Sequence, residues 1–302
     1  MMTQSSTANE IQGTLLAVDT STSHMSVALM RDGILQGELN SNAEKNHSIH
    51  LLPHIRQLLS ASDIQPQQLN AFAVGVGPGS YTGVRIGVTV AKTFAWTHGM
   101  ALIAVSSLSA MALGGLEAYY LRQGNPDPVS GQEEGGGRTP SSTAAPELNR
   151  VGGTALDLVQ KQSGTSWVIP MIEARRGQAF TGLYQVSGHR FSRVVPDGIR
   201  LMSSWADELL DRVQQAGESE RPLRIVFAGE TKLHGAVLAS FFERWTGESA
   251  EVPHELRASH LAELGQRLWS EGHTENPHGL VPNYTQLTEA EVNLLAKSSG
   301  RA

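Results

Sequence analysis

The first folded part of the chain opens with short apolar runs that are separated by polar turns. Runs at residues 14–18, 25–30 and 34–39 have the length and composition of strands. The polar turn Thr20–Ser23 separates the first two runs, and Arg31–Asp32–Gly33 separates the second from the third. Two such turns in succession predict an antiparallel meander of three strands.

The chain then alternates between helical and strand patterns. Residues His47–Ser60 gather their apolar side chains in one arc of about 120°, which predicts a helix. The run at 71–76 predicts a strand, Tyr81–His98 a helix that stops at Gly99, and Ala101–Val105 a further strand. These segments form a strand–helix–strand unit.

A second folded region begins near Trp167 with another hairpin. Strands are predicted at 168–172, 179–186 and 225–228, the first two joined at Arg175–Gly177, and helices at 235–245, 261–271 and 289–296. The order of elements predicts an α/β protein with two lobes of duplicated βββαβα topology. This is the actin-like, Hsp70-like ATPase (ASKHA) fold, which sugar kinases also share. The predicted lobes are residues 14–122 and 151–302.

The stretch between the lobes has a different composition. Residues 123–150 are rich in Gly, Pro, Ser and Glu and contain almost nothing to bury. Such a segment cannot offset the entropy of ordering itself. We expect a disordered low-complexity insertion there.

Composition and charge exclude several classes of function. The 302 residues carry a net charge of −6, which argues against a surface that grips nucleic acid by itself. Cysteine is absent, which excludes disulfides and thiolate chemistry. The polar N-terminus does not look like a signal peptide, and no apolar run reaches the ~18 residues of a membrane span. We expect a soluble cytoplasmic protein.

A glycine turn joins the strand at 71–76 to the helix that follows. Residues Gly77–Gly87 read GPGSYTGVRIG, and backbone N–H groups at such a helix start can bind an anion. The Walker pattern fails because Val84 and Arg85 follow Gly83, and the dinucleotide fingerprint fails in both registers. The chemistry alone favours a tight turn that packs the helix on its strand, with Ser80 as the helix cap.

Five segments resemble a known family. They are LLAVDTSTSHMSVAL (15–29), NHSIHLLPHI (46–55), AVGVGPGSYTGVRIGVTVAKTFAW (73–96), IEARRGQAFTGLY (172–184) and VPNYTQLTEAEV (281–292). Together they are similar to the bacterial TsaB family, also called YeaZ, from about Leu15 to Val292. The resemblance implies an actin-like fold and a non-catalytic role as scaffold and activator of the catalytic paralogue TsaD. TsaD transfers a threonylcarbamoyl group to N6 of the tRNA adenosine next to the anticodon.

The same resemblance implies a set of partners. A TsaE-like ATPase would complete the complex, and tRNA would be reached indirectly, through the complex. Alone, the chain would form a homodimer through the surface that its catalytic partner uses. No membrane contact is implied.

The turn Asp19–Thr20–Ser21–Thr22 is the candidate nucleotide contact. It stands where actin-like ATPases place their first phosphate loop, and its carboxylate and hydroxyls suit that chemistry. A capped β-turn is the alternative. The second half of an ATP site would come from the hairpin at Glu173–Gly177, where relatives usually carry Asp at the position of Glu173. We therefore predict no certain cofactor and leave ATP or ADP at a subunit junction open.

We predict neither a metal site nor catalytic residues. His50 and His54 have a spacing that zinc sites use, but an exposed helix face is the preferred interpretation. The resemblance places the metal-binding His-x-x-x-His pair of the catalytic paralogue on Ser107 and Met111, and neither is a suitable ligand for a hard or borderline metal.

The helix at Tyr81–His98 has an apolar arc of about 220°, wider than one packing surface requires. Small residues recur every four positions along it. The helix is either buried between its own sheet and a neighbouring helix or part of an intermolecular bundle, and the resemblance favours the bundle. The predicted partner interface comprises Leu51, Leu52, Ile55, Leu59, Gly83, Val84, Gly87, Val88, Ala91 and Ala95.

Two other functions stay open at this point. The first is an independent ATPase of the actin and sugar-kinase class. The second is a metallopeptidase-like protein.

Overall fold

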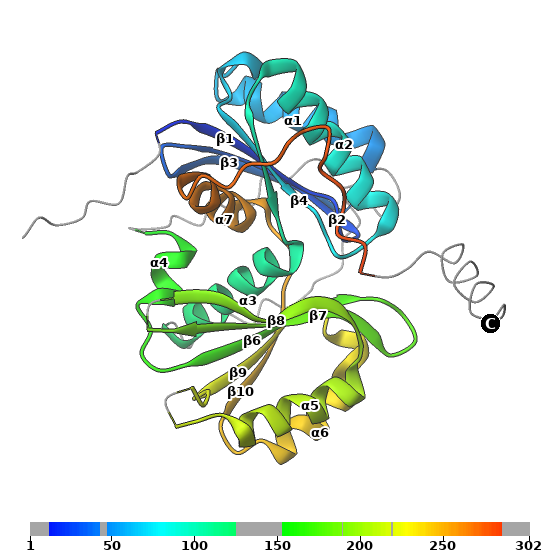
Figure 1. Cartoon of the computed structure of the whole chain (residues 1–302), viewed down its shortest axis with the longest axis vertical. Coiled ribbons are helices and arrows are strands. Elements are labelled where there is room, and N and C mark those ends of the chain that lie inside the picture. The colour runs from blue at the N-terminus through cyan, green and yellow to red at the C-terminus, as the bar shows by residue number, and fades with distance from the viewer. Residues whose placement is uncertain (1–11, 43–46, 125–152, 189, 219, 286–302) are drawn as a thin grey trace, which may run out of the picture.

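The computed structural model describes residues 12–42, 47–124, 153–188, 190–218 and 220–285, which form two lobes (Figure 1). Nearly all of the predicted insertion at 123–150 and the helix predicted at 289–296 lie outside the described residues. Within the described part, no helix is both long and apolar enough to cross a membrane.

The described N-terminal lobe is built on a sheet with the strand order β3-β2-β1-β4-β5. The meander comprises β1 (Thr14–Asp19), β2 (His24–Arg31) and β3 (Ile34–Asn42), which pair antiparallel as predicted. Strands β4 (Ala71–Gly75) and β5 (Ala101–Val105) run parallel to β1. Helices α1 (His47–Ala61) and α2 (Tyr81–His98) pack on one face.

The described second lobe repeats this order as β8-β7-β6-β9-β10. Its strands are β6 (Ser166–Glu173), β7 (Gln178–Ser187), β8 (Arg190–Leu201), β9 (Arg224–Gly229) and β10 (Glu248–Pro253). Helices α5 (Met202–Gln215) and α6 (Gly235–Arg244) cover its outer face (Figure 1). The duplicated order confirms the two-lobed α/β fold with actin-like topology that the sequence predicts.

Two helices cross between the lobes. Helix α3 (Ser107–Gly124) continues from β5 but packs on β6 and β9, whereas α7 (Ala258–Ser270) packs on β1 and β2 (Figure 1). Helix α4 (Ala155–Gln160) contacts both of them. Each sheet is therefore covered on its inner face by a helix from the other half of the chain. The lobe boundaries at residues 122 and 151 stay a prediction.

Side chains of the N-terminal lobe hold the start of α7. The backbone N–H of Ala258 donates to Ser26 Oγ at 2.7 Å, and that of Ser259 donates to Glu38 Oε1 at 2.9 Å. Arg257, just before the helix, forms an ion pair with Glu38. These bonds satisfy N–H groups that have no partner within the helix.

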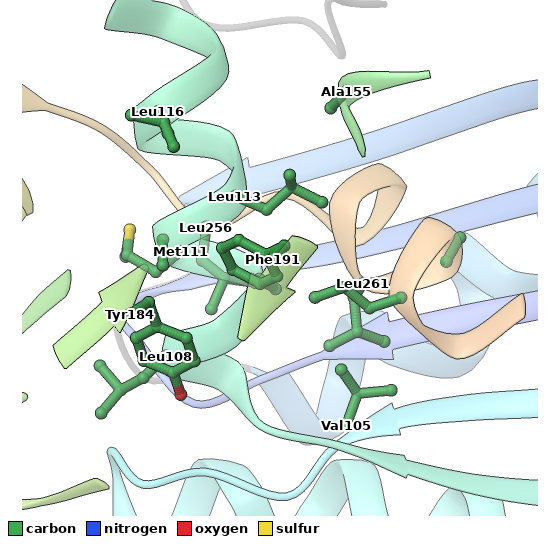
Figure 2. Close-up of a cluster of buried hydrophobic side chains, with 14 of the residues drawn as sticks. Val105, Leu108, Met111, Leu113, Leu116, Ala155, Tyr184, Phe191, Leu256 and Leu261 are labelled. Atoms are coloured by element: carbon green, nitrogen blue, oxygen red, sulfur yellow. The ribbon is translucent and has the colours of Figure 1, made fainter. Parts of the chain in front are cut away.

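The largest apolar cluster runs through both lobes. Figure 2 shows Leu113 of α3, Phe191 of β8 and Leu261 of α7 converging in it. Burial of this surface stabilises the contact between the lobes, because removing apolar area from water is favourable. Separate clusters lie beneath α1 and α2 and beneath α5 and α6.

The segment after α7, residues 271–285, forms a strap along the N-terminal lobe. The N–H of Glu275 donates to Leu102 O at 2.7 Å, and that of Asn283 donates to Val76 O at 2.8 Å. Lys92 Nζ donates to Leu280 O at 2.8 Å, while the Leu280 side chain is buried beside α2. The strap therefore covers part of α2 from within the same chain.

Candidate functional site

The predicted nucleotide turn is bonded within the protein. Asp19 Oδ1 accepts hydrogen bonds from the backbone N–H and the hydroxyl of Ser21, both at 2.7 Å. Its Oδ2 accepts a hydrogen bond from Ser107 Oγ at 2.6 Å. Burial is the main cause that raises the pKa of Asp19, and the bonds from Ser107 and Ser21 oppose it. The carboxylate thus fastens the end of β1 to the start of α3.

The glycine turn packs directly on that turn. A Cβ added at Gly75 would lie 1.8 Å from Asp19 Oδ2, and one at Gly83 would lie 2.0 Å from Thr20 O. Thr20 Oγ1 donates to Gly83 O at 2.7 Å. These glycines permit an approach that any side chain would block, which supports tight-turn packing of α2.

The candidate residues Asp19, Thr20, Ser21 and Thr22 are all buried by this packing. His47 also holds the turn, with its Nε2 2.9 Å from Thr22 O. The glycine turn covers Asp19, Thr20 and Ser21, so a ligand could reach the polar atoms of these three residues only if the two turns separated. Ser80 accepts a hydrogen bond from the Gly83 N–H at 3.3 Å and caps α2, as predicted.

The residues at the paralogue's metal-binding positions are part of the core. Ser107 Oγ, besides donating to Asp19, accepts the N–H of Gly77 at 3.1 Å, and Met111 is fully buried. His50 and His54 lie on α1 with ring centroids 6.1 Å apart. Among the described residues, no group of three or more His, Cys, Asp or Glu side chains could hold a metal ion.

The hairpin between β6 and β7 is braced by Glu173. Its Oε2 lies 2.8 Å from His234 Nε2, and its Oε1 accepts the N–H of Arg175 at 2.6 Å. Glu230 Oε2 in turn accepts the N–H of Glu173 at 2.8 Å. Glu173 therefore links the hairpin to the loop after β9. No local sequence pattern pointed to His234 as its partner.

A cavity of about 260 Å³ lies between the lobes. Thr22 and His24 line it from the β1–β2 turn, and Glu230 and His254 line it from the other side. His24 Nε2 lies 3.1 Å from Glu255 Oε1 and joins the two sides. Local sequence patterns gave no signal for this cavity, because its residues come from segments that are distant in the chain.

The predicted partner interface needs a correction. Of its residues only Leu52, which is 52 % exposed, faces solvent. The small residues of α2 face Thr20 and the sheet, and Leu51, Ile55 and Leu59 pack in the core beneath α1. The wide apolar arc of α2 is explained by packing on the sheet, α1 and the strap.

Other residues of α1 and α2 form the exposed surface. Ile49 on α1 is 64 % exposed, and Trp96 on α2 is 69 % exposed. Tyr81, at the start of α2, lies with its ring centroid 5.2 Å from that of Tyr284 in the strap. The Arg85 guanidinium lies 5.3 Å from the Tyr81 ring centroid.

Comparison with known proteins identifies the family. A protein of Bacillus subtilis named tRNA threonylcarbamoyladenosine biosynthesis protein TsaB is 33 % identical over 282 residues, which cover 92 % of this chain and 96 % of the relative. The chain belongs to the TsaB family. A TsaB of Haemophilus influenzae is 41 % identical over 106 residues, which cover 35 % of this chain and 44 % of that protein.

Two further comparisons concern the fold and a segment shared with TsaD. The structure of YeaZ from Pseudomonas aeruginosa matches with a TM-score of 0.60 at 21 % identity and covers 90 % of this chain and 99 % of that one. It supports the fold. The family model for TsaD, tRNA N6-adenosine threonylcarbamoyltransferase, matches residues 36–131. That part of this TsaB-family chain includes α1, α2 and α3.

Proposed function

We propose that this chain is a non-catalytic subunit in the synthesis of threonylcarbamoyladenosine in tRNA, where it binds and activates a catalytic paralogue of the TsaD kind. The observation that carries the proposal is the exposed apolar surface of α1 and α2, within the segment that resembles TsaD. A paralogue that shares this segment carries a similar helix pair. Two similar pairs can pack about a pseudo-twofold axis, as identical surfaces do in symmetric dimers.

The proposed contact is the α1–α2 face, defined by Ile49 and Leu52 on α1 and Tyr81, Arg85 and Trp96 on α2. All five side chains are exposed. Large apolar side chains that gather on one surface mark interaction sites, and aromatic residues and Arg are enriched in interfaces. When the paralogue is absent, a second copy of the chain would cover the same face and give a homodimer.

The internal bonding of the Asp19–Thr22 turn supports a non-catalytic role. Asp19 and Thr20 bond to Ser107 and Gly83 of their own lobe and leave no open phosphate loop. We further propose that the complex is cytoplasmic and that a TsaE-like ATPase is its third subunit. In this complex the other subunits hold most of the tRNA. ATP or ADP at a subunit junction would then draw its contacts from more than one chain.

Reconstitution tests the proposal. The chain, the TsaD-like paralogue of the same genome and a TsaE-like ATPase are combined with tRNA and a threonylcarbamoyl donor, and modified adenosine is measured. We expect modification only when the paralogue and this chain are both present. Modification by this chain alone would show that it is catalytic, and full activity of the paralogue without it would remove the activator role.

A further inference from the structure

Three exposed cations lie at one end of the second sheet. Strands β6 and β9 are parallel neighbours, so the loops at their carboxyl ends leave the sheet at the same edge (Figure 1). Arg175 and Arg176 follow β6, and Lys232 follows β9; all three are exposed. We call these three residues the basic rim. The carboxyl end of parallel strands is where α/β sheets commonly bind ligands.

The two loops that carry the basic rim are fastened to each other. Glu173 of the first loop lies 2.8 Å from His234 of the second, through Oε2 and Nε2. The N–H of Glu230 donates to Met171 O at 2.9 Å, and its carboxylate accepts the N–H of Glu173. Both carboxylates are therefore engaged in bracing the loops.

Within the described part of the chain, the side chains of the basic rim form no hydrogen bond or ion pair with another residue. Two exposed arginines elsewhere in this lobe are paired: Arg193 lies 3.1 Å from Asp197, and Arg244 lies 2.6 Å from Asp207. Among the described residues, the basic rim thus gathers positive charge without a carboxylate partner in a chain whose net charge is −6.

The backbone of the hairpin also favours a role outside the fold. Arg175 and Arg176 have φ angles of 68° and 56° and precede Gly177 at 74°. Residues with a Cβ rarely adopt this left-handed conformation, which costs free energy. Because both arginine side chains are exposed, packing does not account for their presence at these positions.

We propose that the basic rim binds phosphate groups of the RNA backbone when the chain is part of its complex. The identification of the RNA as tRNA rests on the proposed function. Guanidinium groups match phosphate oxygens in a planar fork, and a lysine adds a point charge. With so few cations, the rim positions the RNA and adds to a larger contact made by other subunits.

The test uses the reconstituted complex and measures its affinity for unmodified tRNA at several salt concentrations. The variant carries Arg175→Gly, Arg176→Gly and Lys232→Ala, because glycine adopts the left-handed conformation without strain. Each lost phosphate contact lowers the salt slope of binding by about 0.7–0.9. We expect affinity at low salt to fall about 10-fold and the slope of log K against log salt to fall by about 2.

A matched control separates this contact from loss of general charge. Arg212→Ala, Arg244→Ala and Arg267→Ala remove three arginines that already have carboxylate partners. We expect these changes to leave the salt slope near that of the unmodified chain. Thermal unfolding of both triple variants checks that each folds.

Two results would overturn the proposal. One is a basic-rim variant with the affinity and salt slope of the control. The other is unchanged tRNA affinity with weaker binding of the catalytic subunit, which would make the rim a protein contact. Because subunit association is measured separately by size-exclusion chromatography, failure of the RNA contact would leave the scaffold function standing.

Discussion

The hydroxyl of Ser107 donates a 2.6 Å hydrogen bond to the carboxylate of Asp19. Asp19 ends the first strand, and Ser107 begins α3, the helix that packs on the second sheet. The position at which the resemblance places a metal ligand of the catalytic paralogue is thus used here for a structural bond. The polar groups that resemble a nucleotide site therefore stabilise the fold, because they bond to one another.

The first prediction concerns that bond. Ser107→Ala removes a partner of the buried Asp19 and of the Gly77 N–H. Leaving such groups without partners costs about 1–3 kcal/mol, so we expect a loss of this size in the free energy of unfolding. Chemical denaturation measures it. Ser60→Ala, at an exposed position on α1, is the control, and equal stability of the two variants would contradict the prediction.

The second prediction concerns the glycines beneath the turn. Gly83→Ala places a Cβ 2.0 Å from Thr20 O, so the backbone of α2 must shift. We expect the free energy of unfolding to fall by about 1–3 kcal/mol or more. Gly217→Ala, where nothing lies within 4 Å of the added Cβ, should cost nothing comparable. Similar denaturation midpoints for these variants would show that the two turns do not pack as described.

The third prediction concerns pH. Burial, with a smaller contribution from the charge of His260, lowers the pKa of His254 to about 3 from its ordinary value of 6.5. As the pH falls below 6.5, His254 takes up a proton in the unfolded chain but stays neutral in the folded chain. The stability that neutral His254 contributes is therefore complete above pH 6.5 and is lost as the pH falls towards 3. The loss is about 1.4 kcal/mol for each pH unit in that window.

Replacing His254 tests this origin of the pH dependence. Unfolding free energies of the unmodified chain and of His254→Leu are compared between pH 7 and pH 5. The variant should have a slope that is smaller by about one proton. His273→Leu, at an exposed position in the strap, should keep the original slope. If both variants keep it, His254 is not the group responsible.

The fourth prediction concerns ATP. Because Asp19, Thr20 and Ser21 are buried beneath the glycine turn, we expect the isolated chain to show no magnesium-dependent ATP hydrolysis above that of Asp19→Ala. A phosphate-release assay measures this. Turnover that Asp19→Ala abolishes would favour the independent ATPase instead.

Sequence patterns predicted the elements with strong local signals. The structure confirms the meander and α2, with its Ser80 cap and its end at Gly99. The signals for these elements are strand alternation, a capping side chain and a helix-ending glycine, and each depends only on residues nearby in the chain. Helix α5 was missed although Met202, Trp205 and Leu209 have helical spacing. Helix α3 is apolar on nearly all sides because it lies between the two sheets, so it lacks the amphipathic signal of a surface helix.

The candidate site was harder to predict, for a physical reason. The stripe of small residues on α2 indicated that another segment packs closely against this helix. The structure shows such packing, but the segment is the turn at Thr20, more than 60 residues earlier in the same chain. Sequence spacing cannot distinguish a turn of the same chain from a helix of another. The strap at 271–285 likewise covers part of α2 from a distant segment.

The central claim is that the α1–α2 face binds the catalytic paralogue. The most direct measurement is the dissociation constant of that complex for Ile49→Glu, with Ile34→Glu as the control; the two isoleucines are 64 % and 66 % exposed. The account predicts at least about 10-fold weaker binding for Ile49→Glu and unchanged binding for Ile34→Glu. Equal binding by both variants would contradict it.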